Sequence, residues 1–116
     1  MRGYHRTGER VTMRCMELTI RVHELKLWPE FTEDIALGRK PFDVRVDDRD
    51  FRVGDTLLFR EWDARRLPDG PSDGSAGYTG FTCTAQVTYI LRGWEGLMPG
   101  YCVLGLGRDI TLTKAT

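Results

Sequence analysis

Apolar and polar residues alternate most regularly between Phe81 and Arg92. Successive side chains of a strand point to opposite faces, so an alternation with a period of two predicts a half-buried strand over residues 81–92. Shorter runs of the same pattern predict strands over residues 16–22, 42–46, 56–62 and 101–106. In the strand over 81–92 we expect one face to be apolar throughout, formed by Phe81, Cys83, Ala85, Val87, Tyr89 and Leu91.

After the predicted strand over residues 16–22, the alternation changes phase at His23 and Glu24, because the next apolar residues are Leu25 and Leu27. A shift of one residue turns an apolar set toward the opposite face of a sheet. The sequence therefore predicts a β-bulge or a strand break at His23 and Glu24.

Residues 29–37 are the best helix candidate. Pro29 is suited to the first helical position, and Glu30 favours the positive N-terminal end of a helix. Phe31 and Ile35 lie one turn apart, and Gly38 supplies a left-handed residue at which the helix ends. One short helix near the start of the chain is therefore expected.

Five or six short strands with one or two short helices predict a mainly β fold of the α+β class. We expect a small curled sheet or a small β-barrel, since closing the sheet removes exposed edges. A chain of 116 residues fits one domain. We predict a flexible basic arm over 1–15, the domain over 16–108 and a C-terminal tail over 109–116, with a flexible loop at 63–77.

The charge balance, the cysteines and the length of the apolar runs limit the partners and the cellular compartment that we expect. Lys plus Arg and Asp plus Glu number 17 each, so a polyanion site must be a local patch rather than a property of the whole molecule. Three cysteines, Cys15, Cys83 and Cys102, include no CxxC pair and argue against a disulfide framework or a zinc site. No apolar run approaches the ~18 residues of a spanning helix. We expect a cytoplasmic protein that has no membrane, metal or cofactor partner.

Three charged residues around the strand over 42–46 form the main candidate site. With Phe42, Val44 and Val46 turned inward, Asp43 and Arg45 would share the opposite face. Lys40 precedes the strand closely enough to join them. The three side chains either line a charged cleft or form a surface ion pair beside a lysine that caps the helix.

Several fragments, taken together in their order, resemble one family. The chain is similar to ASCH domains of the PUA-like superfamily, particularly a small bacterial and phage branch of uncharacterised function. The resemblance runs from His23 to about Leu106. It rests on the fragments HELK at 23–26, PEF at 29–31, GRK at 38–40, DVR at 43–45, DRDF at 48–51, VGD at 53–55, REW at 60–62, YTG at 78–80 and GLMPGYCVLGL at 96–106.

This resemblance implies a PUA-like β-barrel with a cleft beside the first helix and an association with RNA. It also implies the pattern G-x-K-x-x-E-x-R, met by Gly38, Lys40 and Arg45, with Asp43 where glutamate is usual. Some members of the superfamily hydrolyse N4-acetylated cytidine with a lysine and a threonine from this segment, and others are ribonucleases. The hydrolase threonine would fall at position 43, where this sequence has an aspartate in place of that nucleophile.

Further residues complete the predicted RNA- or ligand-binding set. His23 is either a proton shuttle near the cleft or a hydrogen-bonded structural residue. Trp62 and Tyr78 flank the loop and either stack on bases or pack at a strand end. The acidic run at 47–50 is expected to be a solvated turn rather than a metal site. The full set is His23, Lys26, Lys40, Asp43, Arg45, Arg49, Trp62 and Tyr78.

Binding of RNA or of a nucleotide-like ligand is the leading function, because binding needs no activated nucleophile and the sequence shows no strong one. The alternative is an enzyme: an amidohydrolase on a modified nucleobase, or a ribonuclease. Lys40 would then be the base, with water activated by Asp43 or Glu61. A third hypothesis is a regulatory interaction module that uses the outer surface of the domain.

Overall fold

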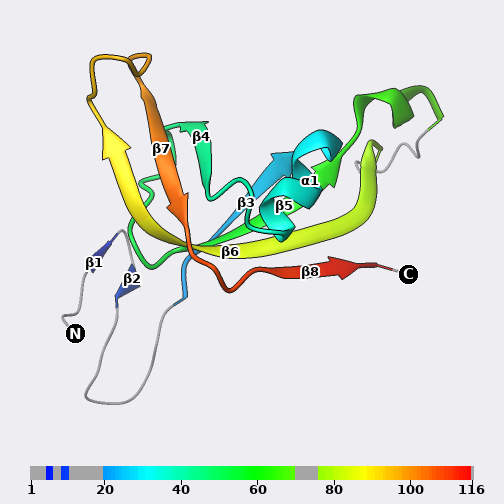
Figure 1. The fold of residues 1–116 in the computed structure, drawn as a ribbon, viewed down its shortest axis with the longest axis horizontal. Coiled ribbons are helices and arrows are strands. Elements are labelled where there is room, and N and C mark those ends of the chain that lie inside the picture. The colour runs from blue at the N-terminus through cyan, green and yellow to red at the C-terminus, as the bar shows by residue number, and fades with distance from the viewer. Residues whose placement is uncertain (1–4, 7–8, 11–19, 70–75, 116) are drawn as a thin grey trace.

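Most of the chain forms one open, strongly curved sheet of six strands (Figure 1). The structure is a computed structural model, which describes residues 5–6, 9–10, 20–69 and 76–115. The strand order is β3-β5-β6-β7-β4, and β8 pairs with β6 outside this path. The strands are β3 (Val22–Leu27), β4 (Phe42–Val46), β5 (Thr56–Trp62), β6 (Tyr78–Arg92), β7 (Tyr101–Leu106) and β8 (Thr111–Lys114). The expectation of a mainly β fold with a short helix is confirmed.

The sheet has two free ends and is not a closed barrel. β3 and β4 are the terminal strands of the order, and no backbone ladder joins them. Two arginine side chains span the gap instead: Arg45 Nη2 donates to the carbonyl of Lys26 at 2.6 Å, and Arg49 Nη1 donates to the carbonyl of Glu24 at 2.5 Å. The prediction of a closed barrel is therefore wrong: the sheet is curled and open, and the bonds described here between β3 and the segment of β4 come from side chains.

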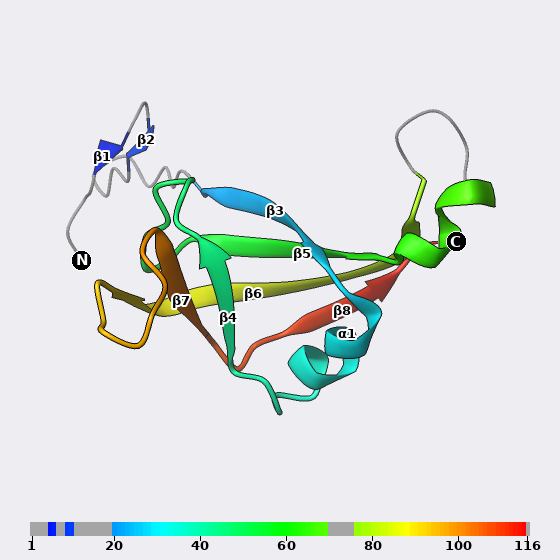
Figure 2. The same cartoon turned by 90° about the horizontal axis from the view of Figure 1, so that it is seen from above.

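Strand β6 connects the two halves of the sheet, as Figures 1 and 2 show. Its first half lies between β5 and β8, and its second half pairs with β7. The register with β7 shifts after Val87, which faces Leu106, because the next paired residue is Tyr89, which faces Gly105. Thr88 is thus an extra residue that bends the strand.

The extra residue in β6 also reverses its two faces. Before it, Cys83, Ala85 and Val87 are buried; after it, Tyr89 is 64% exposed. Ile90 packs against the core in its place. The prediction of a single apolar face over 81–92 is correct up to Val87 and wrong beyond it.

Strand β3 runs without interruption through His23 and Glu24. It pairs residue by residue with the parallel strand β5, from Val22 opposite Thr56 to Leu27 opposite Glu61. The predicted break is therefore wrong: His23 takes an inward position on the same face as Leu25 and Leu27, a position that its bond to Asp55 makes tolerable. Residues 16–19 of the expected first strand lie outside the described residues.

Helix α1 (Pro29–Ala36) confirms the helix prediction. Pro29 opens it, Leu37 caps it, and Gly38 follows at a φ of +79°. The amide of Lys40 then donates to the carbonyl of Asp34 at 2.9 Å, which folds the chain back toward β4. Buried Thr32 and Ile35 turn the helix toward the sheet.

The remaining segments differ in part from expectation. The segment over 109–116, expected to be a tail, contains β8, and the loop over 63–77 begins with a 3-10 helix (Ala64–Asp69). The expected basic arm lies largely outside the described residues, within which β1 (His5–Arg6) pairs with β2 (Glu9–Arg10). In the part of the chain that the structure describes, no helix has the length and apolar character needed to cross a bilayer.

Candidate functional site

Strand β4 has the opposite orientation to the one predicted. Asp43 is 4% exposed, whereas Phe42, Val44 and Val46 are 43%, 46% and 48% exposed. The apolar residues of this terminal strand therefore remain about half exposed, and the inward position belongs to Asp43. Asp43 can occupy the inner position because two cations converge on its carboxylate; without such partners, burial of the charge would be costly.

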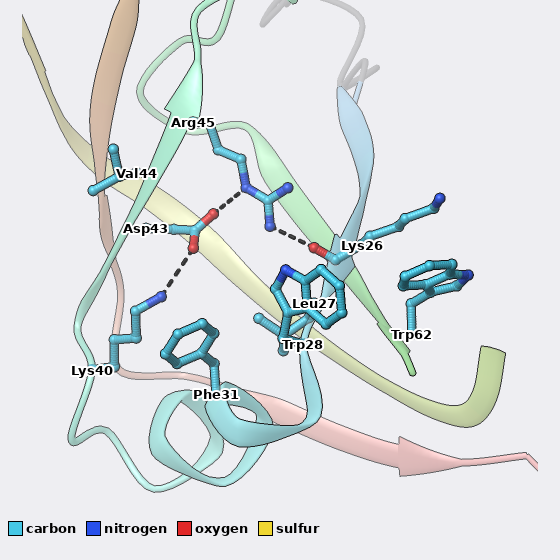
Figure 3. A pocket seen from close by; sticks show the side chains of 9 residues that line it. All are labelled: Lys26, Leu27, Trp28, Phe31, Lys40, Asp43, Val44, Arg45 and Trp62. Atoms are coloured by element: carbon cyan, nitrogen blue, oxygen red, sulfur yellow. Dashed lines mark hydrogen bonds and ion pairs between the residues drawn. The ribbon is translucent and has the colours of Figure 1, made fainter. Parts of the chain in front are cut away.

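Lys40, Asp43 and Arg45 form a connected ion cluster, the triad (Figure 3). Lys40 Nζ donates to Asp43 Oδ1 at 3.1 Å, and Arg45 Nε donates to Oδ2 of the same carboxylate. Arg45 also reaches the carbonyl of Lys26 across the gap. The predicted association of the three residues is confirmed, and the triad forms the inner wall of the gap between β4 and β3.

An aromatic wall faces the triad across this gap (Figure 3). It is formed by Trp28, Phe31 and Trp62, from the start of α1 and the end of β5. The rings of Trp28 and Trp62 are 5.4 Å apart and nearly perpendicular at 76°. Lys26 Nζ lies 4.4 Å from the centre of the Trp62 ring, and Lys40 Nζ lies 4.4 Å from that of Phe31. Both lysines therefore hold their charge against a ring face.

The triad and the aromatic wall enclose a cavity of about 560 Å³, here called the main cavity. Five of the predicted site residues line it, and they carry three positive charges and one negative charge. Prediction from the sequence missed the aromatic residues of α1, whose position just before and within the first turn places them beside the end of β3. The lining is completed by Leu27 and Val44, and the predicted five are Lys26, Lys40, Asp43, Arg45 and Trp62.

A second, smaller hollow of about 260 Å³ adjoins the main cavity and is called here the side cavity. Lys26 and Arg45 line both. The predicted residues Arg49 and Tyr78 lie in the side cavity, together with Arg60, which was not predicted. Seven of the eight predicted binding residues therefore line one or other of two neighbouring cavities. The side cavity is lined by Glu24, Leu25, Lys26, Arg45, Arg49, Arg60 and Tyr78.

The eighth predicted residue, His23, lies elsewhere. Its Nε2 is 2.8 Å from Oδ2 of Asp55, which is 1% exposed, and its ring meets that of Phe51 at 4.7 Å. Arg21 Nε lies 3.6 Å from the other oxygen of Asp55. The structural alternative for His23 agrees with this placement.

Glu61, the second candidate for activating water, faces α1 and is not among the residues that line either cavity. Its two carboxylate oxygens accept hydrogen bonds from the hydroxyls of Thr32 and Thr79, the latter at 2.8 Å. This carboxylate therefore joins the helix to β5 and β6. Asp43 is the candidate carboxylate that reaches the main cavity.

The acidic run at 47–50 is engaged by arginines. Arg92 Nε lies 2.5 Å from Asp47, Arg52 Nη2 lies 2.6 Å from Asp50, and Arg49 Nε lies 3.8 Å from Asp48. Within the described residues, no group of three or more side chains is arranged to hold a metal ion.

Cys83 and Cys102 are free thiols in the core. Burial raises the pKa of both thiols above the ordinary value, because the thiolate is poorly solvated there. A raised pKa and a closed position make each a poor nucleophile.

Comparison with known proteins identifies the family. Residues 22–106, which span β3 to β7 and both cavities, match the family described as Domain of unknown function (DUF3850). The chain therefore belongs to the DUF3850 family. It is also similar to the "Uncharacterized 12.9 kDa protein in GpA 3'region" of Escherichia phage P2, with 36% identity over 42 residues. That match covers 36% of this chain and 38% of the phage protein.

Proposed function

We propose that this DUF3850 protein binds a nucleotide or a short segment of single-stranded RNA in its main cavity, as an ASCH-like domain. One observation carries the proposal: an aromatic wall faces a charged triad across a single cavity of about 560 Å³. That volume lies within the roughly 300–1,000 Å³ typical of small-ligand pockets.

The two walls of the cavity suit the two parts of a nucleobase. An unpaired base has an apolar face, which stacks on tryptophan, and a polar edge, which requires hydrogen bonds. Both Asp43 oxygens are engaged by Lys40 and Arg45, yet each carboxylate oxygen has a second lone pair for an exocyclic amine. The proposed ligand is therefore a base with an amino group at its polar edge.

The tryptophans of the cavity provide a direct test. The chain has three: Trp28 and Trp62 line the cavity, and Trp94 is 66% exposed. In a Trp94→Phe background, fluorescence therefore reports from the cavity. Short single-stranded RNAs are expected to quench it, with an affinity that falls as salt rises.

Variants connect this signal to the triad. Lys40→Ala and Arg45→Ala are expected to weaken binding about tenfold each, the loss expected for one charge-assisted hydrogen bond. The matched control is Arg39→Ala, because Arg39 adjoins Lys40 in sequence but pairs with Glu33 and Asp34 on the exposed side of α1. Absent quenching, or binding that ignores salt and the triad variants, would contradict the proposal.

A second candidate function is hydrolysis of an acylated nucleobase, with Lys40 as base and Asp43 orienting water. It is favoured by the position of Lys40, whose side chain is 19% exposed and whose ammonium lies inside the cavity against Phe31. Lys40→Arg keeps the charge but replaces the amine with a guanidinium, which cannot act as a base in proteins. Acetate release from N4-acetylcytidine should vanish in this variant while binding persists. Absence of turnover by the unaltered protein would dismiss this candidate.

A further inference from the structure

We propose that the side cavity binds a phosphate group, so that the ligand is a phosphorylated nucleotide or an RNA phosphodiester rather than a nucleoside. This inference rests on the proposed function and extends it to the class of ligand. Its basis is the lining of the hollow, which carries four cations, Lys26, Arg45, Arg49 and Arg60, and a single carboxylate, Glu24. The molecule as a whole has no net charge, so this excess is local.

The carboxylates in reach leave part of this charge uncompensated. Glu24 pairs with Arg60 at 3.0 Å, Asp43 is shared between Arg45 and Lys40, and exposed Asp48 lies 3.8 Å from Arg49. Among the described residues, the ammonium of Lys26 meets the ring of Trp62 and pairs with no carboxylate. An anion entering the hollow therefore meets a positive site.

The three guanidinium groups are also held in place before any ligand binds. Arg45 and Arg49 are each tied to a carbonyl of β3, and the guanidinium carbon of Arg60 lies 3.8 Å from the centre of the Tyr78 ring. Each guanidinium has five N–H donors, and the bonds described above use only one or two of them. Ordered groups with free, planar donors are well suited to phosphate oxygens and lose little entropy on binding.

The position of the side cavity determines which ligand would fill it. Lys26 and Arg45 line both cavities, so a base in the main cavity has a phosphate-binding hollow directly beside it. A nucleoside would leave the hollow empty. A nucleoside monophosphate or a dinucleotide would place its charged group there.

The test compares nucleosides, their 5′-monophosphates and dinucleoside monophosphates by tryptophan fluorescence in the Trp94→Phe protein. We expect phosphorylated ligands to bind about tenfold or more tightly than the nucleosides, which corresponds to at least one charge-assisted hydrogen bond. Equal gains for monophosphates and dinucleotides would identify the phosphate itself as the determinant. A gain confined to dinucleotides would assign the hollow to a phosphodiester.

The variant Arg49→Gln/Arg60→Gln should remove this gain, measured on the same variant as the ratio of nucleotide affinity to nucleoside affinity, because both residues line the side cavity and neither lines the main cavity. The charge-matched control is Arg39→Gln/Arg108→Gln, which alters two exposed arginines outside both cavities. Thermal unfolding establishes that each variant is folded. Should the double variant fail to fold, the single variants and the comparison of ligands on the Trp94→Phe protein still decide the question.

The possible failures are distinguishable. If nucleosides bind and phosphate adds nothing, the phosphate inference is overturned and the proposed function stands. If the gain survives Arg49→Gln/Arg60→Gln, the phosphate binds elsewhere. If the gain disappears equally in the control variant, it depends only on the total charge of the protein. Either outcome overturns the inference. If neither nucleosides nor nucleotides bind, the proposed function fails and takes the phosphate inference with it.

Discussion

Two buried carboxylates, those of Asp43 and Asp55, have similar partners and different surroundings. Asp43 is 4% exposed and is held by Lys40 and Arg45; Asp55 is 1% exposed and is held by His23 and Arg21. Asp55 also accepts the amide of Arg52 at 2.9 Å and helps to fix the turn before β5. Asp43 instead borders a cavity that is walled on its other side by aromatic rings.

The difference between these sites shows that a buried ion cluster is not by itself a sign of function. Both carboxylates satisfy the requirement that a buried charge be paired. The Asp55 cluster uses its bonds to fix backbone, whereas the triad leaves its lysine and arginine partly exposed, at 19% and 24%. It is the opposition of charge to an aromatic surface across open space that distinguishes the candidate site.

The largest expected effect is that of Asp55→Asn on stability. The substitution keeps the shape but leaves Arg21 and His23 facing an amide in place of a carboxylate. Removing one partner from a buried pair costs about 3–5 kcal/mol. Urea denaturation should show this loss in the free energy of unfolding. A loss below 1 kcal/mol would erase the proposed contrast with Asp43.

A smaller loss is expected from Gly77→Ala, which disturbs the aromatic wall without touching either carboxylate. Gly77 has a φ of +90°, and a Cβ there would lie 2.3 Å from Nε1 of Trp62. The indole would have to move and lose its bond to the carbonyl of Ala76, while the backbone would be strained by about 1–3 kcal/mol.

The control is Gly93→Ala, where φ is +69° and nothing lies within 4 Å of the new Cβ. It shares the backbone strain and lacks the clash. In the Trp94→Phe background, Gly77→Ala alone should shift the tryptophan emission and weaken ligand binding. Equal binding by both variants would show that the position of Trp62 does not matter.

Asp43→Asn is expected to affect binding more than stability. The partners of Asp43 are partly exposed, so water can solvate them, and the stability loss should be near 1 kcal/mol. Ligand affinity should fall about tenfold because the amide orients Arg45 and Lys40 less strongly. Denaturation and fluorescence titration on one sample measure both effects. A stability loss as large as that of Asp55→Asn would place the two sites in one class.

The smallest effect is expected in thiol labelling. In a Cys15→Ser background, Cys83 and Cys102 should react slowly with an aromatic disulfide at mildly alkaline pH. Their raised pKa means that fewer thiolates form than on an exposed cysteine, and the core hides them. Asp43→Asn should leave the rate nearly unchanged, and Asp55→Asn should raise it because the opened population grows. Rapid labelling of the folded parent would contradict the closed core.

Local signals in the sequence were sufficient to predict the helix and the strands β4 to β7, but not the course of β3 or the presence of β8. Pro29 and Gly38 mark the ends of the helix, and alternation identifies β5 and β7, where Leu57, Phe59 and Leu104 are all buried. These signals act within a single segment, so no knowledge of the rest of the chain is needed.

Which face of a strand turns inward depends on partners that alternation does not reveal. The inversion of β4 follows from the convergence of Lys40 and Arg45 on Asp43. His23 takes an inward position because it bonds to Asp55, which lies 32 residues further along the chain. In the sequence this position was visible only as a change in the phase of the alternation. The extra residue Thr88 depends on pairing with β7, in which Gly105 makes room: a Cβ there would lie 3.1 Å from Cβ of Tyr89.

The sequence predicted the charged residues of the main cavity and one residue of its aromatic wall, Trp62, but missed Trp28 and Phe31. A charged motif lies within six residues of sequence, whereas the aromatic wall joins Trp28 and Phe31 of one segment to Trp62 of another. The useful signal was an aromatic residue directly before Pro29, since the start of α1 lies beside the end of β3.

Arg45 and Arg49, which bond to β3 across the gap, make the width of this gap dependent on side chains. A backbone ladder is nearly indifferent to side-chain identity, so its spacing is hard to change by mutation. The bonds of Arg45 and Arg49 to β3, in contrast, depend on two side chains. Shortening or removing either side chain is expected to alter the width of the opening between β3 and β4, while the paired strands keep their register.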